Sequence, residues 1–373
     1  MNKQTEVGII GGGLAGLTAA IHLLQQGISV VLFEKNSFPK HKVCGEFISN
    51  EIWEYLQSLH LDISSLQPTK INKTTLSTQN GKTISSKLPL GGFGISRYTL
   101  DHYLYQKVIA LGGVSIQKMV TDVTFSNDFF FITTEDNEFY TCKIALGAFG
   151  KRSNLDIQLE RGFIQKKSPW LAVKAHYELD FPNDLVALHN FKGGYCGVSK
   201  VEKNVANVCY LVQYKSFKKY KNIETFQAEV LSKNPNLNVL FQNGRLLFEK
   251  PLTISQISFE NKPKIENHML MIGDSAGLIH PLCGNGMAMA IHSAKIASEL
   301  SIELIQEKIN RAVFEKQYAL IWKKTFQKRL QFGKIVSKVL LNSYLSNVVM
   351  QIVLIFPFIL PLLIKRTHGK PIK

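Results

Sequence analysis

The first 34 residues constrain the fold of this chain most strongly. A short apolar run leads into a glycine-rich turn, and a helix-like segment and a second apolar run follow it. The turn has the spacing Gly11-x-Gly13-x-x-Gly16, and the second apolar run ends at Glu34. This order predicts a strand, a tight turn, a helix and a second strand that together bind a dinucleotide.

Each residue of the turn has a physical role in that prediction. Gly11 lets the chain turn sharply off the strand, Gly13 lets a pyrophosphate approach the backbone, and Gly16 lets helix and strand pack closely. The helix begins at about Leu14 and Ala15, whose backbone N–H groups are free to bind phosphate oxygens. The partial positive charge of the helix N-terminus favours the same anion.

Glu34 is the acidic residue expected at the end of such a unit. Its carboxylate can accept hydrogen bonds from both hydroxyls of an adenosine ribose, and it would repel a 2′-phosphate. A glycine turn without a ligand is the competing interpretation, and the acidic residue argues against it. This unit alone does not distinguish FAD from NAD.

A second motif follows a buried apolar run late in the chain. It comprises Gly-Asp-Ser-Ala-Gly at 273–277, a proline loop, and a glycine pair that opens a helix rich in small residues. Asp274 can accept hydrogen bonds from the hydroxyls of a sugar chain. The N–H groups near Gly286 and Met287 can face an electron-rich ring oxygen, helped by the helix dipole. These features suit a long cofactor.

With these motifs the sequence resembles the flavoprotein oxidoreductases of the p-hydroxybenzoate hydroxylase type, most closely their geranylgeranyl reductase-like branch. The resemblance extends over about residues 5–300 and rests on four motifs in the family's order. They are the opening glycine turn, a Cys-Gly segment at 44–45, Ile-Ser-Arg-x-x-Leu-Asp at 95–101, and the Gly-Asp motif.

The resemblance implies that the cofactor is FAD. The opening turn would hold the pyrophosphate, and the acidic residue after it would hold the adenosine ribose. By the family pattern Arg97 approaches the phosphate and ribose region, and Val120 contacts the adenine through its backbone. Asp274 would bind the ribityl chain, and Gly286 with Met287 would contact the edge of the isoalloxazine ring.

The implied fold is α/β, with α+β character overall. It has a Rossmann-like FAD-binding domain of the GR2 type, an inserted antiparallel β-sheet domain for the substrate, and a C-terminal helical region. The predicted FAD-binding domain is 1–69, 97–168 and 262–300, the substrate domain is 70–96 and 169–261, and the C-terminal helices are 301–373.

Cys44 is the candidate catalytic residue, because the family places its loop near the flavin ring. It would donate a proton or contact the substrate, and the competing interpretation is a small packed cysteine. His280 and Cys283 lie in the proline loop, where packing is the expected role. No Ser/His/Asp grouping or pair of carboxylates indicates a second catalytic centre.

One departure concerns the electron donor. The family's middle motif reads Gly-Ala-Asp-Gly, and here Phe149 stands at the aspartate position. A phenylalanine cannot accept hydrogen bonds, which weakens the expectation that NAD(P)H docks as in the hydroxylases. The external reductant is therefore expected to be NAD(P)H or a reduced electron-carrier protein.

The five cysteines are scattered, and no His/Cys cluster has metal-ligand spacing, so we expect reduced thiols and no metal. The polar N-terminus has no signal peptide, which indicates a cytoplasmic protein. A net charge of +16 raises the question of a nucleic-acid partner, but no nucleic-acid module accompanies it.

Lysines gather before a very apolar tail at 348–364. This pattern predicts peripheral contact of residues 322–364 with the inner face of a membrane, while a basic composition that only aids solubility is the alternative. The apolar tail itself can lie on a membrane, pack over the substrate cavity, or span the bilayer.

The leading functional hypothesis is reduction or dehydrogenation of a C=C bond in an apolar isoprenoid-, lipid- or polyketide-like substrate, with hydride transfer at flavin N5. The aromatic-rich insertion favours an apolar substrate only mildly. The alternatives are a monooxygenase, then a halogenase, and a non-catalytic flavin electron carrier or lipid-binding module. A halogenase is the weaker alternative because no active-site lysine can be assigned from the sequence.

Overall fold

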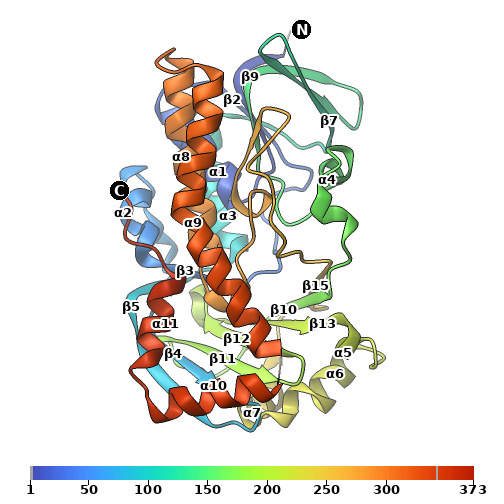
Figure 1. Ribbon diagram of the computed structural model, residues 1–373, viewed down its shortest axis with the longest axis vertical. Helices are drawn as coiled ribbons and strands as arrows, with labels where there is room; N and C mark the ends of the chain where they lie inside the picture. The colour runs from blue at the N-terminus through green and yellow to red at the C-terminus, as the bar shows by residue number, and fades with distance from the viewer. Residues whose placement is uncertain (1–2, 342) are drawn as a thin grey trace.

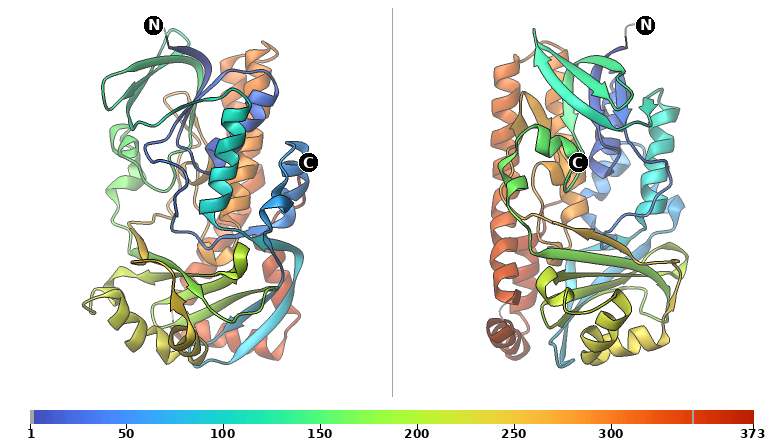
Figure 2. Two further views of the ribbon diagram at one scale, coloured as in Figure 1. Left: turned by 180° about the vertical axis from the view of Figure 1, so that it is seen from behind. Right: turned by 90° about the vertical axis from the view of Figure 1, so that its right-hand side faces the viewer.

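The computed structural model describes residues 3–341 and 343–373. The molecule is elongated and contains two β-sheets, one towards each end of its long axis (Figure 1). A long helix, α9 (Arg311–Leu341), runs along one side of the molecule past both sheets (Figure 2). The α/β fold predicted from the sequence is confirmed, with a parallel sheet first and a largely antiparallel sheet inserted.

The first sheet has a parallel core in the order β17–β9–β1–β2–β6. Its strands are β1 (Gln4–Ile10), β2 (Val30–Phe33), β6 (Val114–Ile116), β7 (Val120–Ser126), β8 (Phe129–Thr134), β9 (Phe139–Gly147), β16 (Ile265–Glu266) and β17 (Met269–Met271). Residues 7–10 of the central strand are buried because β2 and β9 pair with both of its edges.

Among the described residues, five helices besides α9 accompany this sheet, and the first and last of the five pack against each other in one hydrophobic core with it. They are α1 (Leu14–Gln25), α2 (Trp53–Ser58), α3 (Arg97–Ala110), α4 (Asn154–Gln158) and α8 (Gly286–Ile305). Because β1 and β17 lie in the same parallel core, their carboxyl ends share one edge of the sheet. The glycine turn follows β1 and the Gly-Asp motif follows β17, so the fold brings these two motifs to that edge.

The second sheet has nine strands in the order β14–β10–β13–β12–β11–β4–β5–β3, with β15 also paired to β10. They are β3 (Phe47–Ser49), β4 (Thr69–Ser77), β5 (Thr83–Gly94), β10 (Trp170–Glu178), β11 (Leu185–Phe191), β12 (Gly194–Lys200), β13 (Ala206–Gln213), β14 (Arg245–Leu246) and β15 (Leu252–Ser255). Strands β4 and β5 form a hairpin around Asn80-Gly81, a dipeptide typical of hairpin turns, with Gly81 at φ +83°.

The two faces of the second sheet have different neighbours. One face packs its apolar side chains against α6 (Ile223–Glu229) and α7 (Pro235–Asn243), a helix that the sequence reading did not predict. The strand register places Lys174, Cys209 and Leu188 on the opposite face. That face meets loops of the FAD-binding region.

Two short helices end the chain, α10 (Ser343–Ile355) and α11 (Ile359–Thr367). They pack on β4 and β5, where Met350, Val353 and Leu360 surround Ile84. Within the described residues no single helix is long and apolar enough to cross a membrane. One pair, α9 with α10, satisfies length and composition together but is bent by 109°.

Candidate functional site

The glycine turn has the geometry that the spacing predicts. Gly11 has φ +111°, and a Cβ there would lie 2.4 Å from the carbonyl oxygen of Ala148. A Cβ on Gly16 would lie 2.0 Å from the carbonyl oxygen of Gly11. These two glycines are therefore required by the protein's own packing.

Gly13 faces open space instead. The nearest atom to a Cβ built on it is Nη2 of Arg97, at 3.8 Å. Gly13 is also the N-cap of α1, and no side chain caps this helix. The N–H groups of Leu14 and Ala15 have no partner within the helix, so the turn presents donors and an open approach to an anion.

Glu34 lies directly after β2, and two neighbours fix its carboxylate. Oε2 accepts a hydrogen bond from the Gly12 N–H at 2.9 Å. Oε1 accepts from the backbone N–H and the side-chain amide of Asn36, at 3.0 and 2.7 Å. The carboxylate is thus held beside the glycine turn, and its oxygens retain lone pairs for ribose hydroxyls.

Arg97 is the first residue of α3, where Ser96 caps the helix. Its guanidinium forms a bidentate ion pair with buried Asp101, at 2.6 and 2.7 Å. Burial alone would lower the pKa of Arg97, but Asp101, with smaller contributions from Cys44 and Asp274, holds that pKa above its usual value. Lys42 pairs with the same carboxylate at 3.1 Å, so two cations share Asp101 and a net positive charge remains near Gly13, where a phosphate would approach.

The second motif lies after β17, as predicted. Asp274 is half-buried, and its carbonyl accepts a hydrogen bond from Lys262 Nζ at 2.8 Å. The Ser275 hydroxyl accepts a hydrogen bond from the Gly150 N–H at 2.8 Å, which ties this motif to the loop after β9. A Cβ built on Gly273 would lie 2.9 Å from the Cβ of Ala15, so the second motif packs directly against the first turn of α1.

Gly286 begins α8, and no side chain caps this helix either. Asn285, the residue before it, is instead turned towards Glu51 and Thr367, at 3.3 and 3.0 Å. The first N–H groups of α8, near Gly286 and Met287, have no intrahelical partner and can donate hydrogen bonds to a ring oxygen. Met287 is buried.

Two other predicted positions are simpler. Val120 is the buried first residue of β7, paired with Thr134. Its contact with adenine stays a prediction. Phe149 is half-buried after β9, and its ring would lie 3.0 Å from a Cβ on Gly147. Its ring therefore packs back on the strand end and offers no polar group.

Comparison with known proteins agrees with this geometry. A family model described as an FAD binding domain matches residues 4–306. The chain belongs to this FAD-binding family. Its cofactor is FAD, and the resemblance to the p-hydroxybenzoate hydroxylase and geranylgeranyl reductase-like flavoproteins is confirmed.

Individual relatives differ in what they are named for. The chain is 24% identical to digeranylgeranylglycerophospholipid reductase 2 of Methanothermobacter thermautotrophicus over 87% of this chain and 85% of that protein. It is also 24% identical to the FAD-dependent monooxygenase penM of Penicillium crustosum, over 82% and 70%. The flavin-dependent brominase Bmp2 shares the fold at a TM-score of 0.77 and 17% identity, over 97% and 93%.

The residues present fit FAD. Gly13 leaves room for a pyrophosphate between the first turn of α1 and Arg97, and Glu34 stands where the ribose of such a molecule would lie. Asp274 and the uncapped start of α8 follow along the same edge of the sheet. These groups would hold the adenosine, phosphate, ribityl and ring portions in that order.

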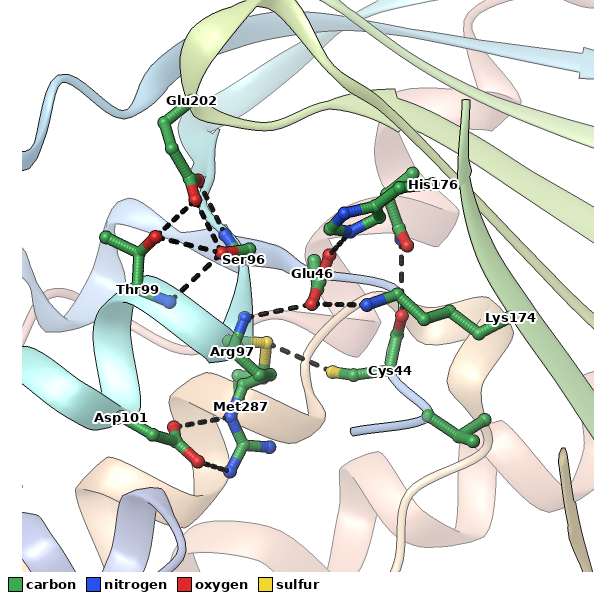
Figure 3. Close-up of polar contacts among 12 residues, drawn as sticks. Cys44, Glu46, Ser96, Arg97, Thr99, Asp101, Lys174, His176, Glu202 and Met287 are labelled. Carbon is green, nitrogen blue, oxygen red and sulfur yellow. Dashed lines mark hydrogen bonds and ion pairs between the residues drawn. The ribbon is translucent and has the colours of Figure 1, made fainter. Parts of the chain in front are cut away.

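Cys44 lies where the loop after β2 meets α8. Its Sγ is 3.3 Å from Sδ of Met287, and its carbonyl accepts a hydrogen bond from the Asn207 side chain at 3.2 Å (Figure 3). The predicted catalytic residue and the predicted ring-contacting residue are therefore in direct contact. The Cys44 thiol is only partly buried.

The sequence reading missed a buried charged cluster beside Cys44. Glu46 is fully buried, and its Oε1 accepts from Lys174 Nζ at 2.8 Å and from the Arg97 N–H at 2.9 Å. Its Oε2 accepts from Nε2 of His176 at 2.6 Å (Figure 3). Lys174 and His176, two residues apart in an otherwise apolar strand, were the signal that could have indicated it.

This cluster connects the loop after β2, which carries Cys44 and Glu46, to the second sheet. Burial would raise the pKa of Glu46, but the hydrogen bond from His176 and the charge of Lys174 hold it below its usual value. Atoms of His41, Glu46 and His176 lie within 4.8 Å of one another, a spacing that could suit a metal ion. Lys174 already neutralises the carboxylate, so the group is compensated without a metal.

The same face of the second sheet is apolar next to the cluster. Trp170, Ala172, Tyr195 and Leu211 form a small core there with Leu278. His280 packs into it with both ring nitrogens buried and unpartnered among the described residues. Burial lowers the pKa of His280 to about 4, so its ring stays neutral. The predicted packing role of His280 is consistent with this environment.

Proposed function

We propose that the protein is an FAD-dependent reductase of C=C bonds in an apolar, isoprenoid- or lipid-like substrate. The observation that carries this proposal is the position of Cys44. Its thiol touches Met287 at the start of α8, and its carbonyl accepts a hydrogen bond from Asn207 of the second sheet. The preceding residue, Val43, packs against the apolar cluster on that sheet. A substrate chain on that face would have a proton-carrying group on the flavin side.

FAD, when bound, supplies the hydride from its ring. The chain's own residues then have three tasks. The apolar wall around Trp170 and Leu211 binds the substrate chain and excludes water. Cys44 holds a proton near the carbon that does not receive the hydride. Glu46, bridged to Lys174, fixes the loop that carries Cys44.

The relatives named as digeranylgeranylglycerophospholipid reductases support this assignment. Their identity of 22–24% makes them a guide to the class of substrate rather than to its structure. We propose a long apolar chain with at least one C=C bond.

Monooxygenation is the second candidate, supported by the likeness to the monooxygenase penM. The apolar face would accept an aromatic or polyketide substrate equally well. A non-catalytic flavin carrier is the third candidate, and it would need neither the apolar wall nor Cys44.

The external reductant is proposed to be NAD(P)H or a reduced carrier protein. Phe149 favours a reduced carrier protein as the electron donor, because a phenylalanine replaces the polar aspartate of the family's middle motif.

The decisive experiment is an anaerobic titration of the purified flavoprotein with NADPH, NADH and dithionite, followed by addition of an unsaturated isoprenoid lipid. A reductase reoxidises its flavin with the lipid and forms a saturated product detectable by mass spectrometry. Rapid bleaching by NADPH, together with oxygen uptake that depends on substrate once air is admitted, would instead identify a monooxygenase. A flavin that reacts with neither lipid nor oxygen would identify a carrier.

A further inference from the structure

The C-terminal helices are apolar on two opposite sides. Their inner side, with Met350, Val353 and Leu360, is buried against β5. Their outer side carries large apolar side chains that are between 37% and 67% exposed, namely Val348, Val349, Ile352, Ile355, Phe356, Phe358 and Leu362. Those in α10 recur every three or four residues, so they form one stripe along the helix.

This stripe has no charged residue within it. From residue 343 to 364 the sequence contains no Asp, Glu, Lys, Arg or His. The exposed side of a helix packed on a soluble domain normally carries charges. A contiguous exposed apolar patch of this kind marks an interaction surface.

Positive charges stand at both ends of the stripe. Exposed Lys338 precedes it near the end of α9, and exposed Lys365 and Arg366 follow it in α11. The whole chain carries a net charge of +16. An apolar stripe between basic side chains complements a bilayer with anionic headgroups, which offers apolar depth and negative charge together.

The part of the range 322–364 that lies in α9 packs against the protein core. Trp322 and Phe326 of α9, which lie in the range 322–364 predicted to contact a membrane, are buried in the main core. These two side chains are therefore unavailable to a membrane, whereas the exposed apolar side chains of α10 and α11 are available. α10 turns away from α9 by 109° and is about 20 Å long at 1.5 Å per residue, so it suits a position in the plane of the interface.

We propose that α10 and α11 dock on an anionic bilayer surface, with Ile352, Ile355 and Phe358 entering the headgroup boundary and Lys365 contacting lipid phosphates. The proposal concerns the tail alone and holds whichever reaction the flavin performs. Its failure would leave the proposed function untouched.

The test is co-sedimentation of the full-length, FAD-loaded protein with vesicles. We expect binding to vesicles of phosphatidylcholine with phosphatidylglycerol, weaker binding to phosphatidylcholine alone, and weakening by salt. The triple variant Ile355→Ser, Phe358→Ser, Leu362→Ser should bind at least roughly tenfold more weakly. The matched control is Val114→Ser, Phe139→Ser, Ile157→Ser, whose side chains are similarly exposed on β6, β9 and α4 of the FAD-binding region; it should leave binding unchanged.

A second variant covers the case in which the triple variant misfolds. Phe358→Trp keeps an apolar ring at an exposed position, and its indole fluorescence should shift to the blue on vesicles and be quenched by brominated lipid. The proposal is overturned by wild-type protein that ignores anionic vesicles, by equal binding of both triple variants, or by unquenched indole fluorescence in the vesicle-bound Phe358→Trp variant. A dimer that the tail triple variant converts to a monomer would assign the stripe to a second copy of the chain instead.

Discussion

Glu46 and Lys174 form a fully buried ion pair, 2.8 Å long, between the loop that follows β2 and a strand of the second sheet. The loop belongs to the part of the chain predicted to bind FAD, and the strand belongs to the second sheet, on which the proposed substrate would lie. The same carboxylate receives the Arg97 N–H, so the pair also fixes the start of α3. Glu46 thereby ties the loop that carries Cys44 to the start of α3 and to the second sheet.

Replacing one member of the Glu46–Lys174 pair should lower the free energy of unfolding by much more than the intact pair contributes to it. We expect Lys174→Met or Glu46→Gln to lower the free energy of unfolding by about 3–5 kcal/mol, because each leaves the other polar group buried without its partner. The double variant should lose less than the sum of the two. Urea unfolding measures all three, with Lys166→Met at the exposed pair with Glu260 as the control. Additive losses would contradict direct coupling of the two residues.

The three glycines of the opening turn should separate cofactor binding from folding. Gly13→Ala has room in the protein, so the chain should fold but bind FAD at least roughly tenfold more weakly, because the methyl group intrudes on the pyrophosphate. Gly16→Ala would clash with the Gly11 carbonyl and should lower the thermal midpoint of the apoprotein itself. Calorimetric titration with FAD and thermal melts of the apoproteins distinguish the two effects. Equal FAD affinity of Gly13→Ala and wild type would refute this site.

Cys44 should affect turnover and leave the cofactor in place. If its thiol supplies the proton, Cys44→Ala should retain FAD and its spectrum but reduce formation of saturated product about a hundredfold. Cys44→Ser should restore part of the rate, since a hydroxyl can also carry a proton. Cys142→Ala, a buried thiol in β9, is the control. Full activity in Cys44→Ala would reduce Cys44 to a packing residue.

Buried histidines should make the fold sensitive to mild acid. Burial is the main cause that lowers the pKa of His41, His189, His280 and His292 to about 4. The unfolded chain therefore binds more protons than the folded one between pH 6.5 and about 4, and the free energy of unfolding should fall as the pH falls through this window.

His280 offers a way to measure one part of that effect. His280→Phe keeps an aromatic ring in the cluster with Trp170 and Phe259 and removes the titrating nitrogens. The free energy of unfolding of this variant should fall less between pH 6.5 and about 4 than that of the wild type, by at most roughly 3 kcal/mol. Urea unfolding at several pH values measures the slope, with His60→Gln on the surface as the control. An unchanged slope would exclude His280 as a contributor.

Local patterns in the sequence were enough to predict the cofactor site. The glycine turn, Glu34 and the Gly-Asp motif each depend on a few adjacent residues, because backbone conformation and helix N-termini impose their own residue types. The Asn80-Gly81 hairpin was predictable for the same reason. Helix α7 was not predicted, because its short polar sequence, PNLNVLFQN, resembles a loop.

The charged cluster could be located only in three dimensions. Lys174 and His176 lie in a strand about 130 residues after Glu46, and each alone fits an ordinary half-buried strand position. Only strand pairing brings Lys174 and His176 to the face of the sheet that meets the loop after β2. Burial there forces the Glu46 carboxylate and the Lys174 ammonium group to pair.

The sequence by itself determined the family and the FAD cofactor and predicted the residues that would line it, because those features depend on short motifs with fixed backbone geometry. The tertiary structure decided what surrounds them. It placed Cys44 in contact with Met287 and paired Glu46 with Lys174. It also buried Trp322 and left the outer side of α10 exposed. Burial and pairing depend on which distant segments meet, and no local pattern of residues specifies that.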